Sequence, residues 1–325
     1  MLTIPVRVCG DSWDNPTEVQ QLLEQAAGKD TVVLDLHAEG PSLYTLTIAQ
    51  TINKYCVEYS VDPKKIYITN WPNRAETVNY TLVDKHHVSH FFLRSKEYWP
   101  TTVYSSESQY AIGFFVGRKT VPRAVLAHYL HTTYGSKCLL SCMLSRTPLP
   151  WDNTNAGIEI DTLDQWLTDQ EQSSFRQWWA NNPIASIDGY YVHDQYNPAF
   201  NTNSALLNFY NKFDIELVAE SYTRGDTFFV TEKTVRPLAA AKPVLVYGPK
   251  RFLERLRGLG YETYGSLWDE SYDYLEGPER WAALKSTVDF VMNLPDEEKQ
   301  ILLLKAKNIA GRNREHLAKT IGITL

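Results

Sequence analysis

Apolar runs of strand length alternate with amphipathic helical patterns along most of this chain, and no other feature constrains the fold as strongly. Strands are predicted at 6–10, 31–37, 64–70, 109–117, 137–143, 212–221, 242–248 and 261–265. Helices are predicted at 16–29, 42–59, 121–135 and 250–260, and from 278 to the end. Strands separated by helices form parallel sheets, because each helix carries the chain back to the edge where the next strand begins. The pattern therefore predicts an α/β protein with two Rossmann-like domains that face each other across a cleft.

The length of the chain agrees with two domains, since single hydrophobic cores stop growing at roughly 250 residues and this chain has 325. We predict an N-terminal α/β domain over residues 1–105 and a C-terminal α/β domain over residues 106–325. The stretch near 145–185 is polar and rich in Trp, and we interpret it as an insertion of loops and short helices in the second domain. Its tryptophans, Trp166 and Trp178 among them, either hold the insertion together or stack on a sugar or base.

The composition is that of a soluble globular protein, with 43% hydrophobic and 22% charged residues. No segment approaches the ~20 apolar residues that span a bilayer, and the start lacks a signal-peptide pattern, so we expect a cytoplasmic protein without a membrane partner. The formal charge of −6 argues against a protein that coats nucleic acid, but it is compatible with a local basic groove. Cys138 and Cys142 lie in an apolar run, where we expect reduced core thiols.

The segment from Phe228 to Gly248 places an adjacent carboxylate and ammonium, Glu232 and Lys233, between an apolar run and an alanine-rich helical pattern. Thr231 is predicted to cap the helix, because its hydroxyl can accept a hydrogen bond from an amide two or three residues further on. Glu232 and Lys233 then occupy the first turn. This turn lies at the carboxyl edge of the parallel sheet, where open α/β sheets bind ligands.

Pro237 interrupts this helical pattern. It has no N–H, and its ring crowds the carbonyl one turn earlier. We therefore predict a separate first turn at 231–236, followed by a main helix in which Pro237 is the first or second residue.

Cations are concentrated around this junction. Between Arg224 and Arg257 the chain carries eight Lys and Arg side chains against three Asp and Glu. A helix N-terminus offers free amides and the positive end of its dipole to phosphate. Lys233 adds a full charge, and Glu232 can accept hydrogen bonds from ribose hydroxyls, so the junction suits a nucleoside diphosphate, with Arg224 as a further predicted contact. The spacing leaves open the alternative of a solvated helix start.

Three more cations, Arg118, Lys119 and Arg123, follow the strand predicted at 109–117 and lead into a helix. They are expected at the same carboxyl edge, where guanidinium groups bind phosphate oxygens through two parallel hydrogen bonds. A solvated loop is the alternative for this segment taken alone.

The run FVTEKTVRPLAAAKPVLVYG, followed by FLERLRGLGYETY and WDESYD, resembles the C-terminal nucleotide-sugar domain of GT-B glycosyltransferases. It is most similar to phage-encoded glycosyltransferase-like proteins and more distantly to the α1,3-fucosyltransferases. The motifs cover residues 110–125 and 214–275. The resemblance implies a GT-B fold and transfer of a sugar from a nucleoside-diphosphate-sugar to a hydroxyl acceptor. A phage-encoded enzyme of this kind would act in the host cytoplasm, with a hydroxymethylated base in DNA as a specific acceptor.

In the fucosyltransferases the Glu-Lys pair of a similar Thr-Glu-Lys step contacts the ribose and the diphosphate of the donor. The resemblance thus implies Glu232 and Lys233 as donor contacts, with Arg118 or Arg123 as the upstream cation. The sugar is not implied to be fucose, because Pro237 interrupts the helix and the motif is shorter here.

The resemblance also implies a catalytic base in the N-terminal domain, because an inverting transfer needs a group that takes the acceptor's proton. Glu39 follows the strand predicted at 31–37, which matches the position of the base in the fucosyltransferases. Asp11 is the second candidate, and His37 is the third because imidazole titrates near neutrality. His37 and His193 are also candidate acceptor contacts. The alternatives are a carboxylate that serves only a helix dipole for Glu39 and a structural role for His193.

No metal or cofactor is expected beyond the nucleotide-sugar substrate. His86, His87 and His90 have no carboxylate at clear ligand spacing, and GT-B enzymes often need no metal. No G-x-G-x-x-G follows a strand, which disfavours a dehydrogenase. The alternative to a glycosyltransferase is a nucleotide-binding module without transfer chemistry.

Overall fold

The computed structural model describes most of the C-terminal half of the chain and parts of the N-terminal half. The described residues are 1–9, 12–13, 16–29, 31–39, 51–69, 81–82, 99–100, 108–116, 120–142, 163, 166–181, 184, 206–220, 223, 228 and 230–324. The chain divides into two compact units, the first formed by residues 1–90 and the second by most of residues 91–325. Each unit is an α/β structure with its own sheet of mainly parallel strands.

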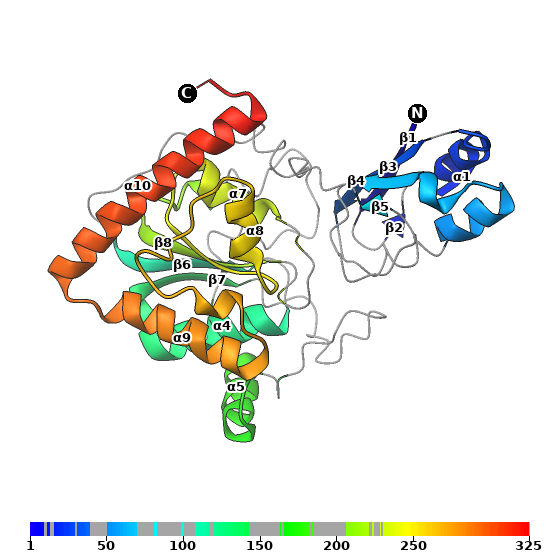
Figure 1. Cartoon of the computed structure of the whole chain (residues 1–325). Coiled ribbons are helices and arrows are strands. Elements are labelled where there is room, and N and C mark those ends of the chain that lie inside the picture. Colours follow the sequence, from blue (N-terminus) through cyan, green and yellow to red (C-terminus); the bar gives the residue numbers. More distant parts are fainter. Residues whose placement is uncertain are drawn as a thin grey trace. The chain divides into compact units, whose positions relative to one another are not determined.

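The first unit, blue to cyan in Figure 1, has a five-stranded sheet in the order β2-β1-β3-β4-β5. Its elements are β1 (Leu2–Cys9), β2 (Ser12–Trp13), α1 (Pro16–Glu24), β3 (Val32–Glu39), η1 (Pro63–Lys65), β4 (Ile66–Thr69) and β5 (Thr81–Leu82). Residues 51–58 are also helical. Neighbouring strands are parallel except β1 and β2. The strands predicted at 6–10, 31–37 and 64–70 are thus confirmed, although β1 already begins at Leu2.

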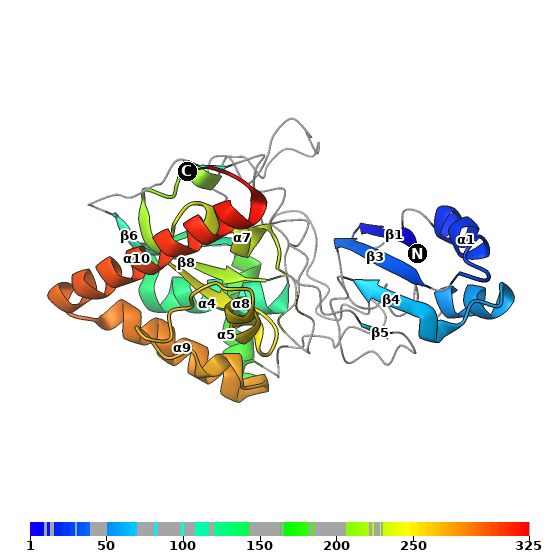
Figure 2. The same ribbon diagram turned by 45° about the horizontal axis from the view of Figure 1, so that its top comes forward.

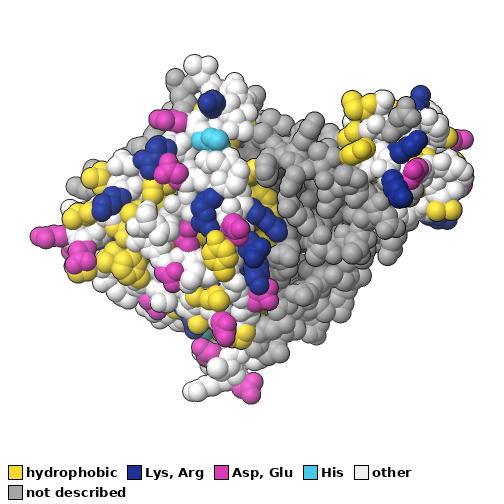
Figure 3. All heavy atoms as spheres, in the orientation of Figure 1, with side chains coloured by type: hydrophobic (Ala, Val, Ile, Leu, Met, Phe, Trp, Pro, Cys, Tyr) yellow, Lys and Arg dark blue, Asp and Glu magenta, His cyan; other side chains and the backbone are white. Residues whose placement is uncertain are grey.

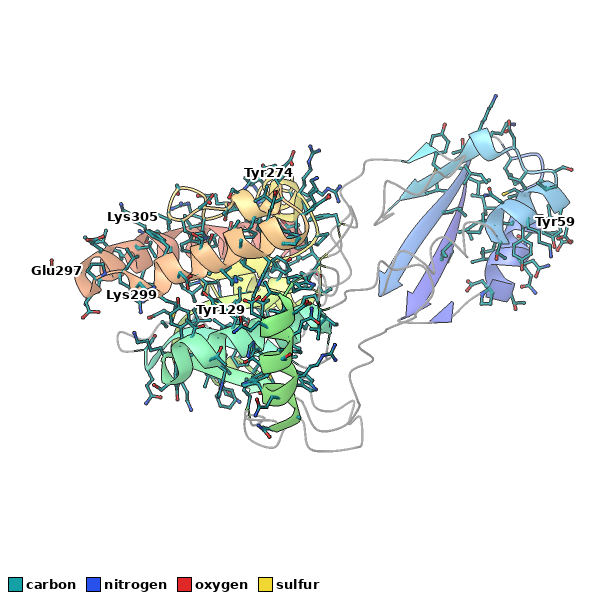
Figure 4. All side chains as sticks on the ribbon, turned by 90° about the horizontal axis from the view of Figure 1, so that it is seen from below. Tyr59, Tyr129, Tyr274, Glu297, Lys299 and Lys305 are labelled. Carbon is teal, nitrogen blue, oxygen red and sulfur yellow. The ribbon has the colours of Figure 1, made fainter. Side chains whose placement is uncertain are left out.

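The core of the first unit forms where the sheet meets its helices. Ile4, Leu34 and Ile66 of three parallel strands share one buried cluster with side chains of α1 and of the helix at 51–58. Next to this cluster, the Gln20 amide of α1 donates a hydrogen bond of 2.9 Å to the hydroxyl of Tyr59, which Figure 4 labels at the end of that helix. The unit is therefore packed by the apolar face of each helix, as its sequence pattern predicts.

The second unit is built on a wholly parallel four-stranded sheet in the order β7-β6-β8-β9. Its elements are β6 (Tyr110–Val116), α4 (Val121–Tyr134), η3 (Gly135–Lys137), β7 (Cys138–Cys142), α5 (Asp169–Asn181), β8 (Phe213–Ala219), α7 (Glu232–Ala239), β9 (Val244–Tyr247), α8 (Phe252–Gly258), η6 (Ser271–Asp273), α9 (Gly277–Asn293) and α10 (Asp296–Ile321). Its strands are buried on both faces, so they appear in the sequence as continuous apolar runs. All four match predicted strands.

Helices cover both faces of this second sheet. Figures 1 and 2 show α4 and α9 on one face and α7 and α10 on the other. On the first face, Tyr129 of α4 meets Trp281 of α9 edge to face, with ring centroids 5.7 Å apart, and Figure 4 shows Tyr129 pointing toward the neighbouring helices. On the other face, Arg314 of α10 donates a hydrogen bond of 2.8 Å to the carbonyl of Ala239 at the end of α7. The sheet is therefore the middle layer of three.

The strand order places a topological switch point between β6 and β8. The chain leaves β6 through α4 and reaches β7 on one side, whereas β8 lies on the other side of β6. Helices that follow neighbouring strands on opposite sides leave a crevice at the carboxyl ends of those strands, and open α/β sheets bind ligands there. In this unit the switch point lies where α4 and α7 begin.

The prediction of a helix break at Pro237 is wrong. A single helix, α7, runs from Glu232 to Ala239 with Pro237 inside it. Proline removes one N–H donor, and the pattern resumes beyond it, because the Ala240 N–H bonds to the Arg236 carbonyl at 3.0 Å. The turn of the chain comes later, at Ala241, whose φ is 52°. So short a helix tolerates one missing bond because its neighbours hold both of its ends.

The strand predicted at 261–265 is also absent, since these residues have no regular structure. Glu262 nevertheless finds the partners that a strand neighbour would provide. The Asn313 side chain of α10 accepts from the Glu262 N–H and donates to the Glu262 carbonyl, both at 2.8 Å. The Asn313 side chain thus makes the two backbone hydrogen bonds that a neighbouring strand would otherwise make. The local apolar pattern does not reveal such a distant partner.

Two other expectations concern cysteines and membranes. The Cys138 and Cys142 thiols are free and buried, and burial raises the pKa of each to about 12. Within the described ranges, none of the helices is both long enough and apolar enough to cross a membrane.

Candidate functional site

Glu220 joins the end of β8 to the beginning of α7. It directly follows the strand, and its side chain is fully buried. Its carboxylate accepts a hydrogen bond from the Thr231 amide at 3.1 Å and from the hydroxyls of Thr231 and Thr234, each at 2.5 Å. Glu220 was not among the predicted site residues, although a carboxylate at the end of an apolar strand, on the ligand-binding edge of the sheet, was a usable signal.

Thr231 is the N-cap of α7, as predicted. Its backbone is extended, and its Oγ1 accepts a hydrogen bond of 3.3 Å from the Lys233 amide. The same hydroxyl donates to Glu220, so both hydrogen-bonding capacities of the hydroxyl are used. The first turn of α7 is thereby fixed to the end of β8 through one buried oxygen.

Glu232 and Lys233 occupy that first turn and form an ion pair. The Lys233 Nζ lies 2.6 Å from Oε1 of Glu232, and the two side chains are 20% and 28% exposed, respectively. Burial alone would raise the pKa of Glu232, but the cations of Lys233 and Arg236 bring it below its usual value. Both side chains can reach solvent and therefore a ligand.

Burial is the main cause that holds the pKa of Lys233 below its usual value. The Glu232 and Glu220 carboxylates oppose this effect, whereas the neighbouring Arg123 guanidinium adds to it. Lys233 on α7 is thus close enough to Arg123 on α4 for the guanidinium to lower the pKa of Lys233. The structure brings together these two sequence-predicted cations from different segments.

Arg123 is 2% exposed and anchors α4 to the end of β8. Its Nε donates to the Ala219 carbonyl at 3.1 Å, and one terminal nitrogen donates to the Glu220 carbonyl at 3.0 Å. A role for Arg123 at phosphate stays a prediction, and its observed hydrogen bonds show that it joins α4 to the end of β8.

Arg236, one turn after Lys233, serves the core instead. Its guanidinium donates to Glu216 of β8 at 2.5 Å and to the Tyr210 hydroxyl at 2.6 Å, and it is 4% exposed. The Tyr210 hydroxyl also donates to Glu216. This buried cluster of Tyr210, Glu216 and Arg236 fixes α7 against the middle of β8.

The carboxyl end of β9, on the far side of β8, is held by Arg280 of α9. This buried arginine donates to the carbonyls of Thr223 and Gly248, at 2.7 and 2.5 Å. Its guanidinium also lies over the Tyr247 ring, 4.5 Å from the centroid. Arg280 therefore ties the segments that follow β8 and β9 to one helix.

Asp273 determines how α8 starts. Its carboxylate accepts from the amides of Leu253 and Glu254, at 2.9 and 3.0 Å, and its backbone carbonyl accepts from the Arg251 amide at 2.7 Å. Arg251 has a left-handed backbone with φ 60°, which is costly for a residue with a side chain. The buried Asp273 occupies the helix terminus that a phosphate would otherwise use.

Figure 3 shows Lys and Arg side chains gathered over α8. Three of them form ion pairs with acids, namely Lys250 with Glu276 at 2.9 Å, Arg251 with Glu254 at 3.6 Å and Arg257 with Glu270 at 3.1 Å. The excess of cations in the sequence around this segment is therefore largely balanced by neighbouring carboxylates in the fold.

Several predicted site residues lie outside the described residues: Asp11, Arg118, Lys119, Arg224 and His193. Glu39 and His37 belong to β3, and Glu39 is its last residue, at the carboxyl end of the first unit's sheet. Strand β3 thus extends two residues beyond its predicted end at 37 and includes Glu39, which was expected just after the strand.

The described tryptophans of the predicted insertion lie in packed clusters. Trp166 is buried between Tyr247 and Trp281, with centroids 5.4 and 5.6 Å away. Trp178 of α5 donates to Nδ1 of His131 on α4 at 3.1 Å. This geometry favours the packing interpretation for both. In the described part of the chain, no three His, Cys, Asp or Glu side chains are grouped as metal ligands.

The residues gathered at the switch point comprise one ammonium that reaches solvent, its carboxylate neighbour, a buried guanidinium and a buried carboxylate. Such a set can hold an anion against Lys233 and a hydroxyl-bearing group against Glu232. When the chain is compared with protein-family models and with curated proteins, none of them matches it.

Proposed function

We propose that this protein is a glycosyltransferase of the GT-B type, which transfers a sugar from a nucleoside-diphosphate-sugar to a hydroxyl acceptor. The observation that carries the proposal is the position of Lys233 and Glu232 in the first turn of α7, at the switch point between β6 and β8. Both side chains are partly exposed there, beside the buried Arg123.

In the proposed complex, Lys233 binds the diphosphate and Glu232 accepts hydrogen bonds from the ribose. The ion pair between Glu232 and Lys233 must open for this. Phosphate oxygens then replace the Glu232 carboxylate at Lys233, and ribose hydroxyls replace the Lys233 ammonium as hydrogen-bond donors to Glu232. During transfer the acceptor oxygen bonds to the anomeric carbon while the bond from that carbon to the diphosphate breaks. Lys233 then stabilises the negative charge that develops on the departing diphosphate.

The acceptor's proton has to pass to a base, and Glu39 at the end of β3 is the residue that we propose for it. Replacing Glu39 by Ala should leave donor binding unchanged and abolish turnover. Unchanged turnover would exclude Glu39 as the base.

Donor binding is the first test of the proposal. Thermal unfolding would be followed with UDP, GDP and their sugars, because a ligand that binds only the folded state raises the midpoint. We expect one nucleoside diphosphate to raise it in the wild type and not in Lys233→Ala. If no nucleotide shifts the midpoint, the proposal fails. Binding without transfer to any acceptor would instead favour a nucleotide-binding module.

For the acceptor we propose a hydroxymethylated base in DNA, on the grounds of the sequence resemblance. DNA binding by phosphate contacts weakens steeply as salt rises. Transfer of labelled sugar to hydroxymethylated DNA, but not to unmodified DNA, would support this acceptor. Equal activity on small-molecule hydroxyls would count against it.

A further inference from the structure

We propose that Glu220 is the positioning residue of the nucleotide site: its buried carboxylate holds the first turn of α7 and supplies the negative charge that lets Arg123 and Lys233 stand side by side as cations. The inference rests on the proposed function, since it gives Glu220 a part in binding a nucleoside diphosphate. It also makes a statement about Lys233 that can be tested without any ligand.

The Glu220 carboxylate accepts hydrogen bonds from the first turn of α7. An amide N–H and two hydroxyls donate to its carboxylate, from Thr231 and Thr234 at 2.5 to 3.1 Å. Acceptance of three hydrogen bonds is what an ionised carboxylate requires when it is withdrawn from water. The fully buried Glu220 side chain is therefore compensated by polar groups of the first turn of α7.

Glu220 is bonded to both segments that carry the cations, the helix α4 with Arg123 and the start of α7 with Lys233. The Glu220 backbone carbonyl accepts from Arg123 of α4 at 3.0 Å, while its carboxylate is bound by the N-cap residue of α7. Thr231 in turn fixes the position of the Lys233 backbone, because its Oγ1 also accepts a hydrogen bond of 3.3 Å from the Lys233 amide. Glu220 thus fixes the backbone from which the Lys233 side chain extends.

The charge of Glu220 has a second consequence. The Thr231 Oγ1 lies 3.4 Å from the Lys233 Nζ and 2.5 Å from the Glu220 carboxylate, so this carboxylate is close to the ammonium. The charged groups that act on Lys233 include Glu232 on its own helix, Arg123 on α4 and Glu220 after β8. Burial and Arg123 both favour loss of the Lys233 proton, and the two carboxylates oppose that loss. When a diphosphate takes Glu232 away from Lys233, Glu220 is the carboxylate that stays.

The test compares Glu220→Gln with a matched control, Glu270→Gln. Glu270 is also buried and accepts from an amide and a threonine hydroxyl, those of Tyr264 and Thr263, both at 2.7 Å. Both substitutions remove a buried carboxylate, so a general loss of stability should appear in both. Only the Glu220 change is expected to alter Lys233.

The first measurement needs no ligand. The rate at which acetic anhydride acetylates Lys233 would be followed against pH by peptide mass spectrometry. We expect the midpoint of this profile to fall by about one pH unit in Glu220→Gln, the lower end of the effect of a nearby opposite charge. Glu270→Gln and the conservative Glu220→Asp should keep a midpoint near that of the wild type. An unchanged midpoint in a folded Glu220→Gln protein would overturn the proposal.

The second measurement is the affinity for UDP and GDP by calorimetry between pH 6.5 and 9. For the nucleotide that binds, we expect the loss of affinity in Glu220→Gln to grow as the pH rises, towards a limit of roughly tenfold for a one-unit shift of the proton equilibrium. A pH-independent loss, equal to that of Glu270→Gln, would overturn the positioning role. If the wild type binds neither nucleotide, the proposed function fails, whereas the acetylation profile still decides the role of Glu220.

Should Glu220→Gln not fold, Thr234→Val tests the same point in a milder form. It removes one of the three hydrogen bonds that stabilise the charged Glu220 carboxylate. The Lys233 midpoint should then fall, by less than the shift expected for Glu220→Gln. An unchanged midpoint in Thr234→Val would overturn the proposal.

Discussion

The Nζ of Lys233 lies 2.6 Å from the carboxylate of Glu232, so two consecutive residues in the first turn of α7 neutralise each other. Consecutive side chains on a helix normally diverge, whereas these two meet in the first turn of α7. A ligand that binds either of them has to compete with the other. Affinity for the ligand and opening of the ion pair are therefore linked.

Lys233→Ala should weaken nucleoside diphosphate binding at least about tenfold, equivalent to roughly 1.4 kcal/mol. The free energy of unfolding should change by less than about 1 kcal/mol, because partly exposed ion pairs contribute little. Calorimetry and urea unfolding measure the two quantities. Lys250→Ala is a matched control, since Lys250 is 33% exposed and also pairs with a glutamate. Equal effects of the two substitutions on binding would contradict a site at α7.

Arg236→Met should destabilise the fold by roughly 3 to 5 kcal/mol, because it leaves the buried Glu216 without its cation. Urea unfolding would measure this loss. The triple variant Tyr210→Phe/Glu216→Leu/Arg236→Met should recover most of it, since three apolar side chains leave no buried polar group without a partner. If the triple variant is as unstable as the single one, the cluster contributes through its shape and not through its charges.

Lys242 is 3% exposed, and burial lowers its pKa from 10.5 to about 8. Below pH 8 the ammonium is charged in the folded and the unfolded protein, so the full cost of burying the charge is present. Between about pH 8 and pH 10.5 the folded protein releases the proton while the unfolded chain keeps it. The free energy of unfolding should therefore rise with pH across this window, by on the order of 3 kcal/mol.

The variant Lys242→Met isolates this effect from the titration of tyrosines. We expect it to be more stable than the wild type at pH 7 and to lose that advantage towards pH 10. Denaturant unfolding at several pH values measures the difference. A difference that does not depend on pH would show that Lys242 titrates normally in the fold.

Gly113→Ala should destabilise the second unit by roughly 1 to 3 kcal/mol, the usual cost of overpacking. A methyl group at this position of β6 would come within 2.8 Å of the Phe213 ring on β8. Thermal unfolding would show the loss. Gly258→Ala is the control, since a methyl group there meets nothing within 4 Å.

Most strands and helices of the described residues follow from hydrophobic patterning. The strands of the second sheet are buried on both faces, and their continuous apolar runs are visible in the sequence. The prediction of a strand at 261–265 was wrong. The apolar pattern there is typical of a strand, but the backbone of Glu262 bonds to the side chain of Asn313, 51 residues away, and not to a neighbouring strand. The break predicted at Pro237 failed for a similar reason, since α7 is held by β8 and α10 more than by its own hydrogen bonds.

The sequence by itself determined the α/β class, the cap at Thr231 and the place of Glu232 and Lys233 in a first turn, because all of these depend on residues within a few positions of one another. Only the tertiary structure decided which groups surround that turn. Glu220 is 11 residues from Thr231, and Arg123 is 97 residues from Glu220, yet hydrogen bonds of about 3 Å join them. Contacts over such separations arise from the order of the strands, and the charge of Lys233 depends on them because electrostatic interactions act through space and not along the chain.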